Sequence, residues 1–177
     1  MAPVVIVHGP TKAGKSWQAK RLAERLGYAY LSSGDLLRSS KDPGILERHN
    51  TGQLARSEDV ERIMRSALMA VPSNRGVVID GFPRKLEEFH HLEQWLQELH
   101  RDIRVVIEVH ITPEESYARM DQRDRGDDHA AAIRRKWAWY AQDTAKVLDY
   151  CRSKGLLKEI DGIGTPEEVA ARIEAAL

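Results

Sequence analysis

The chain has 177 residues, of which 42% are hydrophobic, so it is long enough to bury one sizeable core. Its 27 Lys and Arg residues balance its 27 Asp and Glu residues, which excludes an overall field that would draw it to nucleic acid or a membrane. A single cysteine excludes an internal disulfide. Because there is no apolar run of about 18 residues and no signal-like N-terminus, we expect one cytoplasmic, monomeric domain over residues 1–177.

Apolar runs rich in β-branched residues alternate with longer amphipathic segments. The runs predict five strands, at Val4–His8, Tyr28–Leu31, Val77–Ile79, Val105–Ile111 and Leu156–Ile160. The amphipathic segments predict helices over Ser16–Leu26, parts of Gly34–Met69, Lys85–His100, Thr112–Arg123, His129–Lys154 and Pro166–Leu177. Continuously apolar strands are typical of a parallel sheet covered on both faces, so we predict a three-layer α/β/α fold with a five-stranded parallel sheet. The helical stretch 38–69 is too long for a simple crossover and predicts a helical excursion away from the sheet.

The first predicted strand runs directly into a phosphate-binding motif. The spacing Gly9-x-x-x-x-Gly14-Lys15-Ser16 is that of a Walker A loop, and an amphipathic helix follows it. Such a loop offers backbone N–H groups and a Lys ammonium to phosphate oxygens, and a hydroxyl to Mg²⁺. The alternative is an ordinary glycine-containing turn, which the match of both flanking elements makes the weaker interpretation.

A second cluster, Asp80 to Arg84, comes directly after the third predicted strand. In doubly wound folds, ligands bind at the carboxyl ends of parallel strands, so Asp80 could reach a Mg²⁺ ion beside Ser16. Arg84 would then project toward the same crevice. The alternative is that Asp80 caps the next helix and that Arg84 is an ordinary surface residue.

A third cluster contains Arg119, Arg123 and Arg125, which could converge on one polyphosphate. Fixed cations of this kind suit a transferring phosphoryl group, whose charge is spread over its equatorial oxygens. The alternative is a solvated helix face, in which these arginines pair with Asp121, Asp124, Asp127 and Asp128.

Four segments in this order resemble the nucleoside monophosphate kinase family, and most closely adenylate kinase of the short-lid type. They are Gly9–Ser16, Tyr30–Arg38, Asp80–Arg84 and Arg123–Asp128. The resemblance covers nearly the whole chain. It implies a core of residues 1–31, 56–121 and 129–177, a helical segment 32–55 that binds the nucleoside monophosphate, and a very short lid, 122–128. It also implies transfer of a phosphoryl group from Mg-ATP to a nucleoside monophosphate, with AMP as the first choice.

The resemblance also assigns individual residues. On the ATP side it places Gly9, Lys12, Ala13, Gly14, Lys15, Ser16, Trp17, Arg119 and Gly164. On the acceptor side it places Ser33, Arg38, Gln53, Leu54, Ala55, Gly81, Phe82, Pro83, Arg84, Glu88, Arg125 and Lys136. It implies catalytic roles for Lys15, Arg84, Arg123, Arg125 and Lys136, and it implies that Ser16 and Asp80 hold Mg²⁺, partly through water.

Several positions depart from the family pattern. Lys12 stands where Gly is usual, Ser16-Trp17 replaces Gly-Thr, and Lys136 replaces Arg. Only Asp124 separates the two predicted lid arginines, so we expect a minimal lid.

Glu88 stands where a base-reading Gln is common. An ionised Glu presents only acceptors, which suits the N–H groups of guanine or cytosine better than adenine. One alternative to an AMP kinase is therefore a kinase that prefers GMP or CMP. A second is a P-loop kinase for a small molecule such as shikimate or gluconate. A third is a nucleotide-binding regulator without turnover, which Lys136, Trp17 and the short lid suggest.

Overall fold

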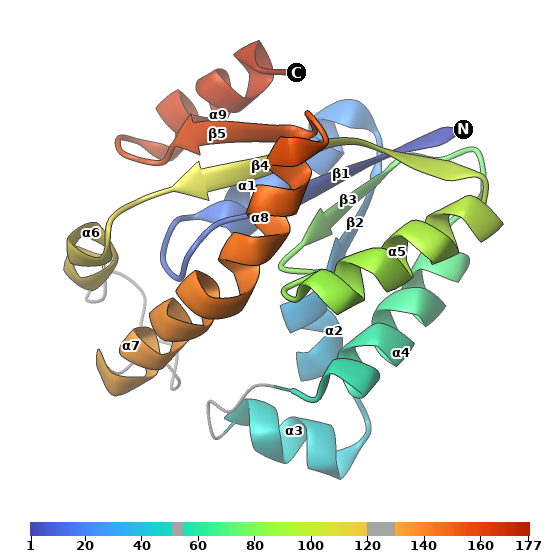
Figure 1. The fold of residues 1–177 in the computed structure, drawn as a ribbon, viewed down its shortest axis with the longest axis horizontal. Helices are drawn as coiled ribbons and strands as arrows, with labels where there is room; N and C mark the ends of the chain where they lie inside the picture. The colour runs from blue at the N-terminus through green and yellow to red at the C-terminus, as the bar shows by residue number, and fades with distance from the viewer. Residues whose placement is uncertain (51–54, 120–129) are drawn as a thin grey trace.

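The computed structural model describes residues 1–50, 55–119 and 130–177. Its centre is a five-stranded, all-parallel sheet with the order β2-β3-β1-β4-β5 (Figure 1). The strands are β1 (Ala2–His8), β2 (Ala29–Ser32), β3 (Val77–Asp80), β4 (Arg101–His110) and β5 (Leu157–Asp161). The prediction of a five-stranded parallel sheet is confirmed.

Helices connect every pair of successive strands. They are α1 (Lys15–Leu26), α2 (Ser33–Arg38), α3 (Pro43–Asn50), α4 (Ser57–Met69), α5 (Leu86–Glu98), α6 (Pro113–Ala118), α7 (Ala130–Trp139), α8 (Ala145–Ser153) and α9 (Pro166–Ala175). A π-helical turn, η2 (Tyr140–Thr144), joins α7 to α8. In the part of the chain that the structure describes, no helix is long and apolar enough to cross a membrane.

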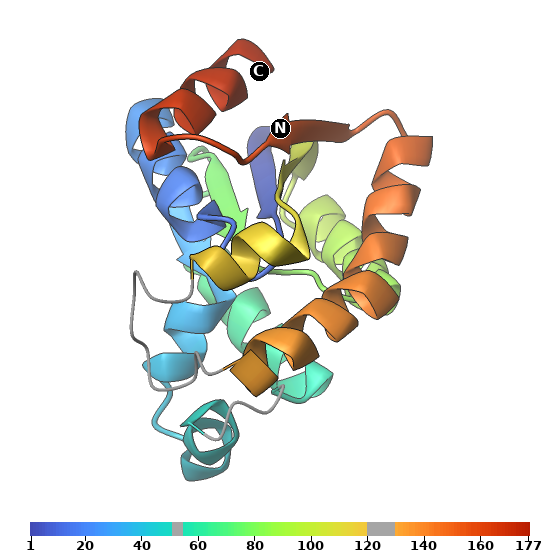
Figure 2. The same ribbon diagram turned by 90° about the vertical axis from the view of Figure 1, so that its left-hand side faces the viewer.

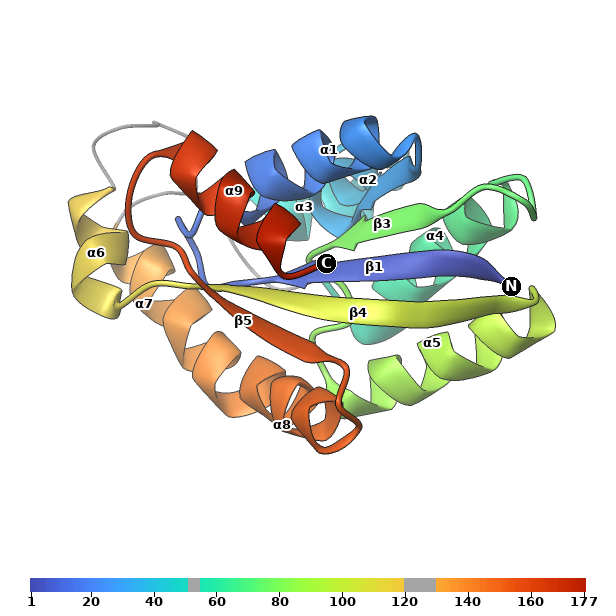
Figure 3. The same cartoon turned by 90° about the horizontal axis from the view of Figure 1, so that it is seen from above.

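The sheet is covered on both faces, as Figure 3 shows from above. One face packs against α1 and α9 through Leu22, Ala23, Val169 and Ile173. The other face packs against α4, α5 and α8 in a cluster that includes Phe82, Phe89, Leu68, Leu92, Val147 and Leu148. Burial of each such large side chain stabilises the fold by roughly 1.5–3 kcal/mol. Two cores therefore hold the sheet as a rigid base for its loops.

The excursion predicted for residues 38–69 is wrong for α4. Met64 and Leu68 of this helix are 2% and 1% exposed and belong to the core on the α5 side. Its apolar residues recur at helical spacing, which directs one face onto the sheet. Among the described helices of this stretch, α3 lies away from the sheet, at the lower end of the molecule in Figures 1 and 2.

Strand β4 begins four positions before its predicted start at Val105. Its first residue, Arg101, is 3% exposed and donates to the carbonyl oxygens of Val71, Pro72 and Arg75 at 3.0, 2.8 and 2.6 Å. Because Arg101, Asp102 and Arg104 are polar, the first part of the strand has no continuous apolar run that would predict it. A buried arginine thus closes the end of α4 onto the sheet.

The long helix predicted over His129–Lys154 is interrupted by η2, which changes where its side chains point. Tyr140 in this turn donates from its hydroxyl to the carboxylate of Glu108 on β4. Thr144 donates to the carbonyl oxygen of Arg84 at 3.4 Å. The π turn therefore ties the helical segment after β4 to the carboxyl edge of the sheet.

His8 is the last residue of β1, and it is buried among cations. Its side chain is 2% exposed, and its Nε2 atom has no hydrogen-bond partner among the described residues. Burial, and then the charges of Arg84 and Lys15, lower its pKa from 6.5 to about 3. The folded protein therefore holds His8 as a neutral imidazole.

His8 makes the fold sensitive to acid. Below pH 6.5 the unfolded chain binds a proton that folded His8 does not accept until about pH 3, so stability falls as the pH is lowered through this window. When the pH is lowered from 7.5 to 5.5, the free energy of unfolding should fall in wild type by about 1.4 kcal/mol more than it falls in His8→Leu. Urea denaturation at both pH values measures this, with exposed His100→Asn as the control. Equal losses in wild type and His8→Leu would contradict the assignment.

Candidate active site

The phosphate loop joins β1 to α1 and is shaped by two glycines. A Cβ atom on Gly9 would lie 2.6 Å from the carbonyl oxygen of Val109, so no larger residue fits against β4 there. Gly14 has φ 81 and caps α1, and its carbonyl oxygen accepts from the N–H groups of Trp17 and Gln18 at 3.0 and 3.2 Å. The chain thus turns tightly into a helix whose first N–H groups face the loop, the arrangement that binds anions.

Lys12 departs from the family's glycine at a point where the backbone is left-handed. Its φ is 64, a conformation that costs a residue other than glycine roughly 1–2 kcal/mol. Arg119 supports this backbone by donating to the carbonyl oxygen of Lys12 at 3.4 Å. Ser116 also supports the loop, through a 2.8 Å bond from its hydroxyl to the carbonyl oxygen of Thr11. Helix α6 therefore holds the strained part of the loop in place.

The predicted metal site lies between two elements. Lys15 and Ser16 open α1, and Asp80 ends β3 with 2% exposure. Asp80 Oδ2 accepts from the Tyr30 hydroxyl at 2.9 Å, while Asp80 Oδ1 is buried without a partner in the described chain. A buried carboxylate oxygen without a partner costs about 1–3 kcal/mol or more, and a hard cation or its water would satisfy it. Asp80 and Ser16 are therefore chemically suited to Mg²⁺.

Tyr30 is a site residue whose contact with Asp80 was not predicted from the sequence. It shares a face of β2 with Ser32, which pairs with Asp80 in the sheet register. Burial and the Asp80 carboxylate raise the pKa of Tyr30. Its phenol therefore stays protonated and keeps donating to Asp80. No local sequence pattern links Tyr30 to Asp80, because the two residues are 50 positions apart.

On the acceptor side, Ser33, Gly81 and Arg84 meet at one carbonyl group. The carbonyl oxygen of Gly81 accepts from the Ser33 hydroxyl and from Arg84 Nε, both at 2.9 Å. Gly81 has φ 73, and a Cβ atom there would lie 3.1 Å from Ser33 Oγ and 3.6 Å from an Arg84 guanidinium nitrogen. Phe82 and Pro83 are buried beside this turn. The structure thus brings four predicted acceptor residues to the position of Arg84.

Arg38 lies next to this group, at the end of α2. Its guanidinium pairs with Asp35 one turn earlier, and its side chain is 44% exposed. A Cβ atom on Gly34 would lie 3.3 Å from Arg38 Nη1, so the side chain folds back along α2. The described residues place Arg38 beside Gly34 and Asp35 and show no hydrogen bond between Arg38 and Arg84.

Glu88 is buried, with 4% exposure, and serves its own helix end. One oxygen, Oε2, accepts from the backbone N–H groups of Arg84 and Lys85, at 2.8 and 3.3 Å. This is the acceptor half of a capping box, and it fixes the turn that carries Arg84. The second oxygen of Glu88 is the only part of the carboxylate that this capping leaves for another role.

Arg119 links the phosphate loop to the segment that follows β5. It donates to Glu115 at 2.6 Å, to the Lys12 carbonyl at 3.4 Å and to the Gly162 carbonyl at 3.0 Å. Its N–H groups are thus directed at the protein, and its flat face remains for stacking. Gly164, predicted to contact the same base, follows two residues after Gly162.

Some of the remaining predicted residues lie in the described part of the chain, and others lie outside it. Ala13 is buried in the phosphate loop, Ala55 precedes α4, and Lys136 lies half-buried in α7. Trp17 lies in the first turn of α1, with the Arg21 guanidinium 5.5 Å from its ring centre. The predicted residues Gln53, Leu54, Arg123 and Arg125 lie outside the described part of the chain, as does the predicted lid, 122–128.

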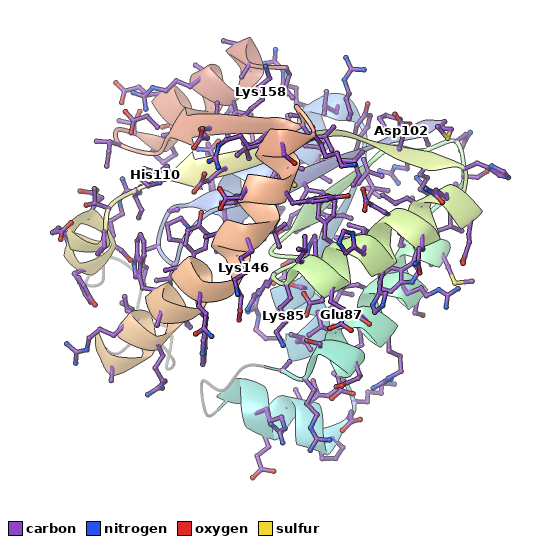
Figure 4. All side chains as sticks on the ribbon, viewed as in Figure 1. Lys85, Glu87, Asp102, His110, Lys146 and Lys158 are labelled. Carbon is purple, nitrogen blue, oxygen red and sulfur yellow. The ribbon has the colours of Figure 1, made fainter. Side chains whose placement is uncertain are left out.

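Figure 4 labels charged side chains that lie near the turn of Arg84 or far from it. Lys85 and Glu87 lie at the start of α5, beside the turn that carries Arg84, and Lys146 lies on the neighbouring α8. Lys158 lies on the edge strand β5, away from the acceptor group. Exposed Lys158 and Glu87 therefore offer matched controls for residues inside the site.

A phosphate loop on a parallel sheet with the order 2-3-1-4-5 places this chain in the class of P-loop kinases. A family model described as adenylate kinase matches residues 7–156. An adenylate kinase from Synechococcus sp. (strain WH7803) is 38% identical over 175 residues, which span 96% of this chain and 95% of that protein. An adenylate kinase from Thermus thermophilus is 37% identical over an alignment 186 positions long, which covers 98% of this chain and 96% of that protein. The chain belongs to the adenylate kinase family.

Proposed function

We propose that this protein catalyses the reversible reaction ATP + AMP = 2 ADP, as a cytoplasmic monomer. The observation that carries the proposal is the placement of two anion-binding groups at one edge of the sheet. The phosphate loop follows β1, and the turn of Gly81 and Arg84 follows the neighbouring β3, where Ser33 joins it from the start of α2. Membership of the family supports the same reaction.

In this proposal the two nucleotides meet with their phosphates between the loop and Arg84. The loop N–H groups and Lys15 hold the ATP phosphates, while Arg84, Arg38 and Ser33 hold the phosphate of AMP. An acceptor phosphate oxygen then attacks the γ-phosphorus in line with the leaving oxygen. This oxygen is already ionised at neutral pH, so no general base is required. Alignment and fixed positive charge supply the rate.

Magnesium enters as the companion of ATP. Ser16 and Asp80 would hold it, partly through water, with Tyr30 fixing one carboxylate oxygen of Asp80. The ion would neutralise charge on the phosphate oxygens as the phosphoryl group moves. Arg123, Arg125 and Lys136 are proposed to add cations at the transferring group, and Ala13 and Trp17 to complete the wall around ATP.

The acceptor base lies on the side of Gln53, Leu54, Ala55 and Glu88 in this proposal. We propose AMP, with Gln53, Leu54 and Ala55 lining its base. Glu88 supports the alternative of GMP or CMP, because its second carboxylate oxygen is an acceptor. A coupled assay of nucleoside diphosphate release, with AMP, GMP, CMP, UMP, dTMP, shikimate and gluconate as acceptors, distinguishes these kinases. Absence of turnover with every acceptor would favour a regulator.

Replacing Lys15 tests the phosphate loop. Because its ammonium is proposed to stabilise charge in the transition state, Lys15→Ala should lower kcat by on the order of 10²-fold or more, with little change in fold. Steady-state kinetics and circular dichroism measure both effects. The matched control, Lys158→Ala on β5, should leave kcat unchanged. A Lys15→Ala variant with most of the wild-type activity would show that the loop has been misread.

Replacing Arg38 tests the division between donor and acceptor sites. Arg38→Ala should weaken AMP binding by about tenfold or more, because a charged guanidinium–phosphate bond is lost, and should leave ATP affinity nearly unchanged. Calorimetry with each nucleotide separately measures this. Arg62→Ala is the control, since Arg62 pairs with Asp59 at the same helical spacing on α4. Equal losses of affinity for ATP and AMP would overturn the division.

Replacing Glu88 by Gln tests base selection without disturbing the turn. The Gln carbonyl oxygen can accept from Arg84 and Lys85 as Glu88 Oε2 does, and its amide then presents a donor at the second position. If Glu88 reads the base, the AMP to GMP ratio of kcat/KM should rise severalfold, since an unsatisfied pair of facing acceptors is removed. Glu87→Gln is the matched exposed control. An unchanged ratio would limit Glu88 to capping.

A further inference from the structure

The segment 161–165, from the last residue of β5 to the residue before α9, is held by two arginines. Arg172 of α9 donates to the carbonyl oxygens of Asp161 and Ile163, at 2.8 and 2.5 Å. Arg119, at the end of α6, donates to the carbonyl oxygen of Gly162 at 3.0 Å. Three consecutive carbonyl groups are therefore tied to two guanidinium groups. Charge-assisted hydrogen bonds of this kind are stronger than neutral ones.

Most of the remaining backbone groups in this loop are also bonded. The N–H groups of Gly162, Ile163 and Thr165 donate in turn to the His110 carbonyl, the Asp161 carboxylate and the Glu168 carboxylate. No residue of the described chain bonds to the N–H or carbonyl group of Gly164. Gly164 is thus the one point in the described loop where the backbone is presented to a ligand.

The conformation of Gly164 depends on the same helix. Its φ is 113, which residues with a side chain rarely adopt. A Cβ atom there would lie 2.4 Å from Glu168 Oε2 and 3.6 Å from Arg172 Nη2. The loop is therefore pressed against Glu168 and Arg172, and Arg172 controls the peptide groups that lead into Gly164.

We propose that Arg172 is a positioning residue for the base of the donor nucleotide. By holding the carbonyl groups of Asp161 and Ile163, it fixes the direction in which Gly164 presents its N–H and carbonyl groups. This inference rests on the proposed function, in which Gly164 contacts the ATP base. Adenine offers an N1 acceptor and an N6 donor, whereas guanine offers an N1–H donor and an O6 acceptor. A fixed N–H and carbonyl pair therefore selects ATP over GTP.

A positioning role is distinct from a purely structural one. Arg172 is 41% exposed, and its contacts are to this loop and to the Asp161 carboxylate at 3.9 Å. Helix α9 is anchored instead by buried Val169, Ala170 and Ile173. Removal of the guanidinium should therefore leave α9 on the sheet and release only the loop.

The test compares Arg172→Ala and Arg172→Lys with wild type. Arg172→Ala should raise KM for ATP about tenfold, with kcat and KM for AMP within about twofold of wild type. The ATP to GTP ratio of kcat/KM should fall severalfold. Arg172→Lys should give an intermediate result, because both bonds come from one nitrogen, Nη1, whose donors a differently placed ammonium replaces only in part. Arg25→Ala is the control, since Arg25 of α1 is exposed and pairs with Glu174 of α9 at 2.8 Å.

Two further measurements separate this inference from the proposed function. Calorimetry with ATP and with inorganic tripolyphosphate needs no turnover, and only the ATP affinity should fall in Arg172→Ala. Gly164→Ala should weaken ATP binding and spare tripolyphosphate. If Gly164→Ala weakens ATP binding while Arg172→Ala does not, the role of Arg172 is overturned and the base site stands. If neither variant changes ATP affinity, or if ATP and AMP are affected equally, the base-positioning account is overturned.

Discussion

The site depends on the common end of three adjacent parallel strands. Val7 of β1 pairs with Asp80 of β3, and His8 pairs with Glu108 of β4. The phosphate loop begins one residue later, at Gly9, which lies too close to β4 for any Cβ atom. Because the register fixes these ends together, the loop, the Asp80 carboxylate and the turn of Arg84 share one edge. Every step proposed for the reaction uses that edge.

Two cations lie at this edge although the chain as a whole is neutral. Lys15 and Arg84 both lower the pKa of His8, which places two cations around the end of β1. A buried neutral imidazole beneath them adds no third charge. The local arrangement therefore gathers positive charge at the end of β1, although the chain as a whole has 27 basic and 27 acidic residues. The same concentration of charge would be lost if strand register slipped by one residue.

Several arginines act as backbone clamps rather than as surface charges. Arg101 holds the segment after α4, Arg119 joins the phosphate loop to the loop after β5, and Arg172 holds that second loop from α9. Each donates to carbonyl groups in loops or at the end of a strand. In sequence Arg101 and Arg172 look like members of a solvated charge pattern, and Arg119 was predicted as an ATP-side residue without its bonds to the two loops. Their role becomes visible only when distant segments meet in the fold.

The sequence predicted the sheet, the phosphate loop and the acceptor turn because each has a local pattern. Apolar runs marked the strands, and glycine spacing marked Gly9 and Gly14. Contacts between distant segments had no such pattern, so the bonds from Tyr30 to Asp80 and from Arg172 to the loop after β5 were not predicted. The start of β4 was also missed, because Arg101 is buried by hydrogen bonding rather than by hydrophobicity. Assignments at Gln53, Leu54, Arg123 and Arg125 stay predictions.

Donor and acceptor phosphates are proposed to bind side by side, one after β1 and one after β3. Calorimetry with a bisubstrate ligand, two adenosines joined through five phosphates, tests it most directly. We expect one ligand per chain, which competes with both ATP and AMP, and we expect weaker binding in both Lys15→Ala and Arg84→Ala. Two ligands per chain, or competition with ATP alone, would contradict it.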